Sequence, residues 1–165
     1  MANKRRNPND FLGELQDIGR QFGILANKGL ATAYEAGAYR FLGNQFMTIT
    51  TKGRKSGLPR TTPIGYVETS DYVYAITRGG ATVSNWWRNV KQNPQVKLQI
   101  GEKVMTVQGE VFEDSNQVRR IIQLFLKQRP GYSRFLGVNA SVSEAELERV
   151  SRNWLAARFQ LKKDY

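Results

Sequence analysis

The chain of 165 residues carries 25 lysines and arginines against 14 aspartates and glutamates, and it has neither cysteine nor histidine. This length fits a single domain that buries roughly two-thirds of the surface exposed by its unfolded chain. The missing Cys and His exclude a disulfide scaffold and remove the usual ligands of zinc, haem and iron–sulfur centres, so we expect no metal site.

Apolar stretches are too short for a membrane-spanning helix, which needs about 18 consecutive apolar residues. The basic N-terminus leads into the polar residues 7–10, where a signal peptide would have its apolar segment. We therefore expect a soluble, cytoplasmic protein.

The positive charge is concentrated in the middle of the chain. Residues 36–101 hold nine cations and two anions, whereas residues 1–35 hold five against four and residues 102–165 hold eleven against eight. Such a field attracts nucleic acid, anionic lipid or an anionic small molecule, and charge alone leaves these three partners open.

Two helices are predicted before residue 44, at residues 10–25 and 30–41, because apolar residues recur there at intervals of three and four. We expect residues 1–43 to form a helical extension that covers the core, and contact with a membrane surface or a partner is the alternative. Residues 44–165 would form the core of the single domain 1–165.

From residue 45 the apolar period changes to two, which predicts strands. Six are expected, at residues 45–51, 61–68, 72–77, 96–100, 103–112 and 154–161. Helices are predicted at residues 85–92, 116–128 and 144–150. The short connections favour antiparallel pairing, so we expect a mainly β (α+β) fold, a six-stranded antiparallel barrel with flanking helices.

The segment TTKGRKSGLPRTTPIGY, residues 50–66, describes a hairpin whose tip carries Lys52, Arg54, Lys55 and Arg60. Its glycines permit turn conformations that aim N–H groups outward, so the tip could form an anion-binding concavity. Arginine forks suit carboxylate or phosphate. The alternative, a solvated tip that protects a sheet edge from aggregation, has equal weight.

A second anion-competent element follows one strand later. Arg78-Gly79-Gly80 ends the strand before a predicted helix, whose N-terminal N–H groups favour phosphate. Taken alone, the glycines are better explained by an ordinary tight turn, and it is their nearness to the basic hairpin tip that suggests an anion site. Trp86 and Trp87 begin that helix about 100° apart, so one indole could lie in the core and the other be available for stacking. The alternative, which we favour, is that both indoles cover the barrel end.

Acid–base chemistry has few candidates in this composition. Without His or Cys, an enzyme built on this chain must borrow its chemistry from a bound redox cofactor that the protein binds and orients. Tyr66 and Tyr132 are the candidate proton donors, and a structural role is the alternative for each.

Three segments in this order resemble the deazaflavin (F420)-dependent nitroreductase and quinone reductase family: TTKGRKSGLPRTTPIGYV, YAITRGGA and NWWRNVKQNPQVKLQIG. The resemblance covers about residues 44–135. It implies a split β-barrel of the flavin-binding superfamily and the cofactor F420, which has a phosphate and an oligoglutamate tail. The implied reaction is hydride transfer from reduced F420 to a quinone, enone or nitro compound.

The resemblance also implies which residues hold the cofactor. Its acidic tail and phosphate would lie against Arg54, Lys55, Ser56 and Arg60. The remaining contacts would come from Thr61, Thr62, Pro63, Ile64, Ile76, Thr77, Arg78, Gly79, Trp87, Arg88 and Asn89. Tyr132 would face the substrate.

The chain departs from this pattern in the helix, where the family reads tryptophan, tyrosine, histidine, asparagine and this chain has Trp86, Trp87, Arg88 and Asn89. Related barrels bind flavin mononucleotide (FMN), haem or fatty acid, so FMN binding and a non-enzymatic cofactor or lipid carrier are the alternatives. A nucleic-acid binder is not expected because no nucleic-acid motif is present. Barrels of this type frequently form homodimers.

Overall fold

The computed structural model describes residues 29–79, 84–139 and 141–161. The predicted helix at residues 10–25 lies outside these ranges. Among the described residues, no helix is long and apolar enough to cross a membrane.

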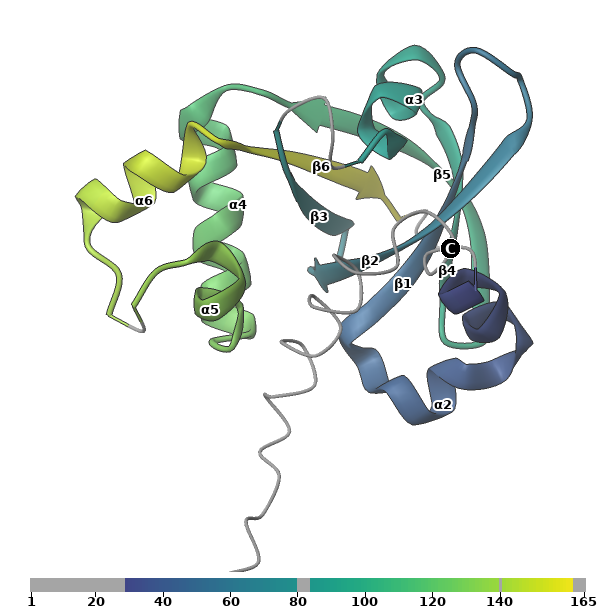
Figure 1. Ribbon diagram of the computed structural model, residues 1–165, viewed down its shortest axis with the longest axis horizontal. Coiled ribbons are helices and arrows are strands. Elements are labelled where there is room, and N and C mark those ends of the chain that lie inside the picture. The colour runs from purple at the N-terminus through teal and green to yellow at the C-terminus, as the bar shows by residue number, and fades with distance from the viewer. Residues whose placement is uncertain (1–28, 80–83, 140, 162–165) are drawn as a thin grey trace, which may run out of the picture.

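Six antiparallel strands close into a barrel in the order β1-β2-β3-β6-β5-β4 (Figure 1). The strands are β1 (Phe46–Lys52), β2 (Pro59–Glu68), β3 (Tyr72–Arg78), β4 (Gln95–Ile100), β5 (Lys103–Phe112) and β6 (Trp154–Gln160). The predicted barrel is confirmed, and each predicted strand is present with ends within two residues.

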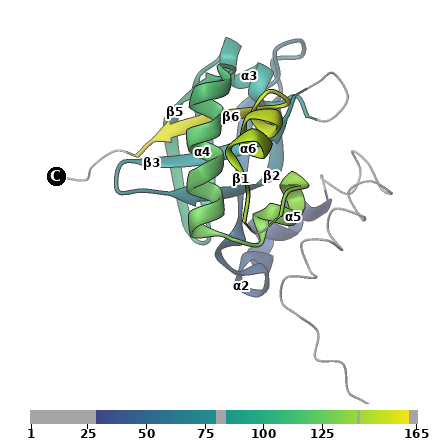
Figure 2. The ribbon, with the colours of Figure 1, turned by 90° about the vertical axis from the view of Figure 1, so that its left-hand side faces the viewer.

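Helices flank the barrel on three sides. Figure 1 shows α3 (Trp86–Gln92) over one end of the barrel, and the N-terminal α2 (Tyr39–Leu42) near the other. In Figure 2, α4 (Ser115–Gln128), α5 (Tyr132–Leu136) and α6 (Glu144–Ser151) lie together over one side of the sheet. The order of strands and helices along the chain therefore matches the predicted one, except that α5 was not predicted.

The two longer helices of this side layer begin with side-chain caps. Asp114 accepts hydrogen bonds from the N–H groups of Asn116 and Gln117 at the start of α4. Ser143 and Glu146 form a capping box at the start of α6. Such caps satisfy N–H groups that the first helical turn leaves without partners, and each typically contributes about 1 kcal/mol.

The N-terminal helical segment includes a π-helical turn, η1 (Tyr34–Ala38), before α2 and the short 3-10 turn η2 (Gly43–Gln45). The buried Tyr34 hydroxyl donates to the Phe46 carbonyl at 2.9 Å and accepts from the Gly101 N–H at 3.0 Å. This one side chain joins the segment to β1 and to the turn between β4 and β5.

Two hydrophobic cores lie on opposite faces of the sheet. The first fills the barrel and includes Met47, Ile49 and Ile64. The second lies between the outer face of the sheet and the layer of α4, α5 and α6, and it includes Val67 and Ile76. Side chains alternate between the faces along each strand, so the two cores assign a face to each strand residue.

Strands β2 and β3 separate over most of their length. They pair only where Tyr66, Val67 and Glu68 lie opposite Ala75, Tyr74 and Val73. Beyond this point residues 59–65 pair with β1 alone, and residues 76–78 pair with β6 alone. We call this opening between residues 59–65 and 76–78 the seam, and it is the split in the barrel.

Candidate cofactor-binding site

The base of the β1–β2 hairpin is fixed to α3 by Asn89. This side chain is 5% exposed; its Oδ1 accepts from the Arg54 N–H at 3.2 Å, and its Nδ2 donates to Thr51 Oγ1 at 2.9 Å. An amide suits this position because it accepts and donates at once. Asn89 therefore holds the start of the basic tip against the helix that covers the barrel end.

The tip, residues 52–60, is closed by its own backbone. The Gly53 N–H donates to the Leu58 carbonyl at 2.8 Å, and the Gly57 N–H donates to the Gly53 carbonyl at 2.7 Å. The Leu58 N–H donates to Ser56 Oγ at 3.3 Å. The N–H groups of Gly53, Gly57 and Leu58, like that of Arg54, therefore donate to acceptors within the protein. The prediction that backbone N–H groups of the tip point outward to bind an anion is wrong for these residues.

The tip instead presents its cationic side chains. Lys52, Lys55 and Arg60 are exposed and Arg54 is half-buried. The ion pairs of the described residues involve other cations, and no described carboxylate pairs with these four or with Arg78. The positive charge at this end of the seam is therefore not neutralised within the described part of the chain.

The pleat of the strands divides the predicted cofactor residues into two sets. Thr62 and Ile64 lie opposite the core residues Ile49 and Met47, so their side chains face the barrel interior. Thr77 faces inward as well, because it follows the outward-facing Ile76. The outward set along the seam consists of Thr61, Pro63, Ile76 and Arg78. The resemblance had assigned both sets to cofactor contact.

Hydrogen bonds order both edges of the seam. On β2, Thr61 Oγ1 lies 2.9 Å from Thr50 Oγ1 of β1 on the outer face. At the end of β3, the Gly79 N–H donates to the Asn153 carbonyl at 2.8 Å, which fixes this end to the turn before β6. Gly80 lies outside the described residues.

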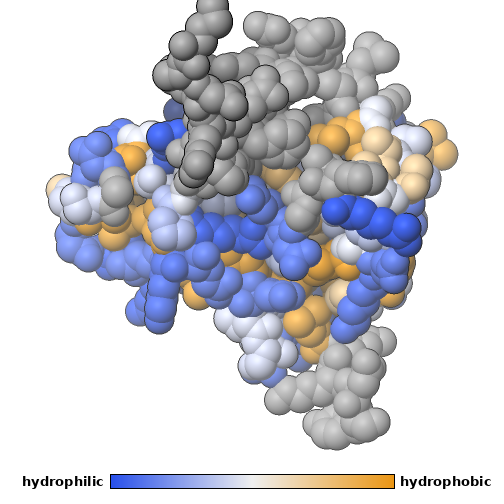
Figure 3. All heavy atoms as spheres, turned by 90° about the horizontal axis from the view of Figure 1, so that it is seen from below, coloured by the Kyte–Doolittle hydropathy of each residue, from blue (hydrophilic) through white to orange (hydrophobic). Residues whose placement is uncertain are grey.

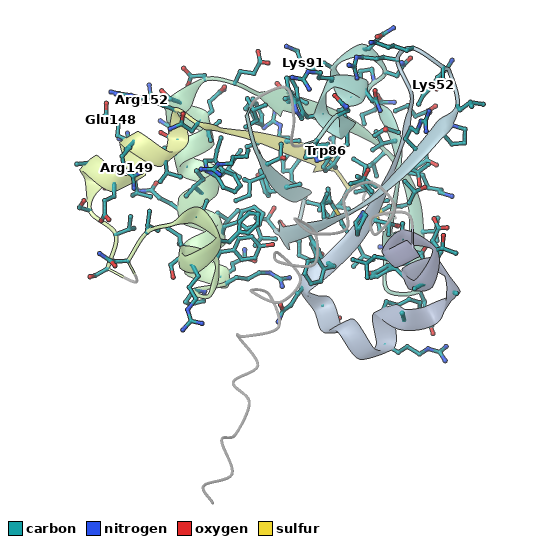
Figure 4. All side chains as sticks on the ribbon, viewed as in Figure 1. Lys52, Trp86, Lys91, Glu148, Arg149 and Arg152 are labelled. Atoms are coloured by element: carbon teal, nitrogen blue, oxygen red, sulfur yellow. The ribbon has the colours of Figure 1, made fainter. Side chains whose placement is uncertain are left out.

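Both tryptophans of α3 are buried, at 3% exposure for Trp86 and 9% for Trp87. The prediction that one indole remains available is therefore wrong, and the favoured alternative, that both cover the barrel end, agrees with this burial. Trp86 packs with Phe159 inside the barrel, at 6.4 Å between ring centroids, and Figure 4 shows it within the barrel beneath α3. Arg88 lies over the Trp87 ring, with Cζ 4.3 Å from the centroid.

Tyr132 lies at the end of the seam away from the basic tip. Its side chain is 5% exposed and packs with Phe125 and Phe135, at centroid distances of 4.9 Å and 5.5 Å. The hydroxyl lies against Gly65, where an added Cβ would be 1.6 Å from the Tyr132 oxygen. Only glycine at position 65 leaves room for the Tyr132 hydroxyl. Burial raises the pKa of Tyr132 to about 12, and the charge of Arg129 opposes the rise.

Arg129 connects the two tyrosine candidates, although they lie on opposite faces of β2. Its Cζ is 5.1 Å from the centroid of the Tyr66 ring, and its guanidinium donates to the Asn44 carbonyl. Tyr66 belongs to the barrel core. Burial raises the pKa of Tyr66 and the repulsion of Glu68 adds to the rise, whereas Arg129 lowers it. Arg129 and Gly65 were not predicted as site residues, although each lies within three residues of a candidate tyrosine.

The candidate site is extended, with charge at one end and hydroxyls at the other. Gly65 lies five positions after Arg60 on β2, which corresponds to about 17 Å along a strand. Figure 4 places Lys52 on the hairpin and the charged Glu148, Arg149 and Arg152 on α6, on the opposite side of the molecule. In Figure 3, described hydrophilic residues cover more of the visible face than hydrophobic ones. A long, partly anionic ligand fits this arrangement better than a compact neutral one.

Gly65→Ala should destabilise the fold by about 1–3 kcal/mol, because the new methyl group overlaps the Tyr132 hydroxyl. Adding Tyr132→Phe should recover part of this loss, and urea unfolding of the two single variants and the double variant measures the coupling. Gly29→Ala is the control, since nothing lies within 4 Å of its added Cβ. Strictly additive losses would contradict the contact.

The stability of the fold should decrease above about pH 10 because of Tyr132. The unfolded chain loses this proton near pH 10, whereas burial holds the folded pKa at about 12. The contribution is thus complete below pH 10 and is lost as the pH rises to 12, by up to roughly 3 kcal/mol. Urea unfolding at several alkaline pH values should show a shallower decline for Tyr132→Phe. Parallel declines for the two proteins would refute this assignment.

Comparison with solved structures supports the fold alone. A structure described as a domain-swapped dimer aligns with 93% of this chain and 99% of its own, with a TM-score of 0.52 and 21% identity. HutZ, the haem storage protein of Vibrio cholerae, aligns with 78% of this chain and 89% of its own, with a TM-score of 0.51 and 14% identity. The shared barrel is therefore seen at sequence identities of 14–21%.

Sequence comparison identifies the family. An F420H(2)-dependent quinone reductase of Mycobacterium tuberculosis is 36% identical over 59 residues, which make up 34% of this chain and 40% of that protein. The matched segment thus spans less than half of the curated relative. The sequence model of the family described as F420H(2)-dependent quinone reductase matches residues 30–140, about two-thirds of the chain. The chain therefore belongs to the F420H(2)-dependent quinone reductase family.

Proposed function

We propose that this chain is an oxidoreductase that uses reduced coenzyme F420 to reduce an activated acceptor, a quinone, enone or nitro compound. The observation that carries the proposal is the row of unneutralised cations, Lys52, Arg54, Lys55 and Arg60, at one end of the seam. Membership of the family supports the choice of cofactor.

The donor groups at the seam fit this cofactor. An oligoglutamate tail and a phosphate need several cations, and arginine forks bind such groups in a bidentate manner. Arg54 and Arg60 would hold the tail, with Lys55 and Ser56 beside them, and Arg78 would reach the phosphate from β3. The cofactor supplies the hydride when it is bound.

The outer face of the seam would carry the rest of the cofactor. Thr61 and Pro63 face outward from β2, and Ile76 faces outward from β3. We assign the inward-facing Thr62, Ile64 and Thr77 a supporting role behind this surface. Asn89 would act indirectly, by holding the hairpin base to α3.

Tyr132 would orient the acceptor by hydrogen bonding and would not supply its proton. Reduction of a quinone leaves an oxygen with roughly the basicity of a phenolate, for which the conjugate acid has a pKa near 10. Transfer from Tyr132, whose pKa burial raises to about 12, would be unfavourable by roughly 3 kcal/mol. The hydroxyl would therefore donate a hydrogen bond to this oxygen, with Arg129 beside it favouring its negative charge and Tyr66 supporting Arg129 from the barrel side. The product would take up its proton from solvent after it leaves this end of the seam.

The remaining sequence-based predictions belong to this proposal. The chain would fold as the single domain 1–165, act on a small-molecule acceptor and form a homodimer. Residues 1–43 would supply any peripheral contact with a membrane. Binding of FMN, or cofactor or lipid carriage without turnover, is the alternative function on the same barrel.

Titration of the purified chain with F420, followed by deazaflavin fluorescence, tests the proposed function. Saturable binding together with reduction of menadione or a nitroaromatic compound by reduced F420 is expected. Tight FMN binding with no response to F420 would favour the flavin alternative, and F420 binding without turnover would favour a carrier.

Arg54→Ala and Arg60→Ala should each weaken F420 binding about tenfold, because each removes a charge-assisted hydrogen bond worth about 1.5 kcal/mol. The loss should shrink as salt screens the charges. Lys103→Ala is the control, since Lys103 is an exposed cation at the start of β5. If the unsubstituted chain and the three variants bind F420 with equal affinity, the tip has no role in binding the cofactor.

Tyr132→Phe should lower kcat about tenfold and leave KM within a factor of about two, because its hydroxyl acts on the developing charge of the acceptor. Steady-state kinetics with F420 saturating and menadione varied separates the two parameters. The pH profile of kcat between about pH 6 and about pH 10 should show no step from this residue in the unsubstituted enzyme. A rise in KM alone would mean that Tyr132 contributes only to ground-state binding.

A further inference from the structure

We call the end of the seam at Tyr132 and Gly65 the acceptor end. Both groups proposed to act there, the Tyr132 hydroxyl and the Arg129 guanidinium, belong to one tight turn. Arg129 follows α4 and Tyr132 begins α5, and the Tyr132 N–H donates to the Arg129 carbonyl at 2.9 Å. The Arg129 N–H in turn donates to the Phe125 carbonyl at 2.7 Å. The backbone of the turn is therefore fixed, whereas the long Arg129 side chain has many rotamers and needs a contact of its own to stay in one place.

This contact comes from the N-terminal segment. The Arg129 guanidinium donates to the carbonyl of Asn44 in η2, 85 positions earlier in the chain. A carbonyl is a neutral acceptor, so it orients the guanidinium without neutralising its charge. No described carboxylate forms an ion pair with Arg129. The positive charge thus remains available to an oxygen that gains negative charge during the reaction.

Tyr34 fixes the chain directly after this contact. Its hydroxyl donates to the carbonyl of Phe46, two positions after Asn44, at 2.9 Å and accepts from the Gly101 N–H at 3.0 Å. The Tyr34 side chain is 1% exposed, so water does not replace either partner if the hydroxyl is removed. Tyr34 therefore restrains the end of η2 against the barrel.

Residues 44–46 also lie against the other group of the acceptor end. Phe46 is opposite Gly65 in the β1–β2 ladder. An added Cβ at Gly65 would be 1.6 Å from the Tyr132 hydroxyl oxygen and 3.7 Å from the Gln45 carbonyl oxygen. A shift of residues 44–46 would therefore change the position of the anchored guanidinium relative to the Tyr132 hydroxyl.

We propose that Tyr34 is a positioning residue of the acceptor end, which acts through residues 44–46 on Arg129. With the hydroxyl bonded to Phe46, η2 is kept where its carbonyl orients the guanidinium toward the reacting oxygen of the acceptor. The N-terminal residues 30–45 are then part of the site and not only a cover of the barrel. The inference rests on the proposed function and adds a residue that does not itself touch the acceptor.

Tyr34→Phe in the full chain removes the hydroxyl and keeps the ring. With reduced F420 saturating and menadione varied, kcat should fall about fivefold, because Arg129 is held less firmly. The KM for F420 should change by less than a factor of about two, since the cations proposed to bind it lie at the other end of the seam. Tyr39→Phe is the control and should leave kcat unchanged, because the Tyr39 hydroxyl of the same segment donates to Glu102 and not to residues 44–46.

Arg129→Gln separates the positioning role from a general loss of stability. In the chain that carries this substitution, Tyr34→Phe should lower kcat by less than a factor of about two, because the charge that Tyr34 positions is already absent. Equal fold losses of kcat in the two backgrounds would overturn the positioning role.

Replacement of Tyr34 by 4-aminophenylalanine isolates the bond to Phe46. The amino group keeps an N–H donor for the Phe46 carbonyl but is a poor acceptor for the Gly101 N–H. The kcat of this protein should stay close to that of the unsubstituted chain, and this arm also applies if Tyr34→Phe does not fold. A kcat as low as that of Arg129→Gln would overturn the role of the Phe46 bond.

Urea unfolding of the unsubstituted chain, Tyr34→Phe, Arg129→Gln and the double variant needs no cofactor. The combined loss of stability should be smaller than the sum of the single losses, because both substitutions release residues 44–46. Strictly additive losses would overturn the link between Tyr34 and Arg129. Failure of the unsubstituted chain to reduce menadione would instead defeat the proposed function and leave this arm unaffected, so the two failures are distinguishable.

Discussion

The separation of β2 from β3 is the constraint on which the candidate site depends. β2 pairs with β1 over seven residue pairs but with β3 over only three. Strand edges without partners expose backbone N–H and C=O groups that otherwise form a ladder. The barrel stays closed through the three pairs at Tyr66 to Glu68, so the seam is open at one end and fixed at the other. In the proposed function, the cofactor would lie along this unpaired stretch.

The two ends of the seam differ in their physical chemistry. The tip is rigid, because Gly53, Gly57 and Asn89 close it with hydrogen bonds, and its cations have no described carboxylate partner. The other end is closed by Tyr132 against Gly65 and is largely shielded from water. Charge is thus available for binding at one end, and an oriented hydroxyl is available in a water-poor environment at the other. This division suits a cofactor with an acidic tail and a reactive ring.

Much of the fold followed from local patterns. Apolar alternation and the glycines and proline of the 52–60 turn identified the hairpin, and similar alternation identified the other strands. The face on which each site residue lies was harder to predict. The resemblance assigned all four residues from Thr61 to Ile64 to cofactor contact, whereas the pleat of the strand turns every second side chain into the barrel. Helical periodicity suggested one exposed indole, but Arg88 covers the Trp87 ring. Arg129 and Gly65 act through contacts between distant segments, which periodicity does not encode.

The central claim is that F420 lies along the outer face of the seam, and hydrogen–deuterium exchange with and without F420 tests it most directly. We expect slower exchange in peptides that cover residues 59–65 and 76–79, because the seam-facing edges of β2 and β3 have no strand partner there. Residues 103–112 of β5, which pair with β4 and β6, should exchange at the same rate in both states. Protection confined to β5, with none along the seam, would contradict the account.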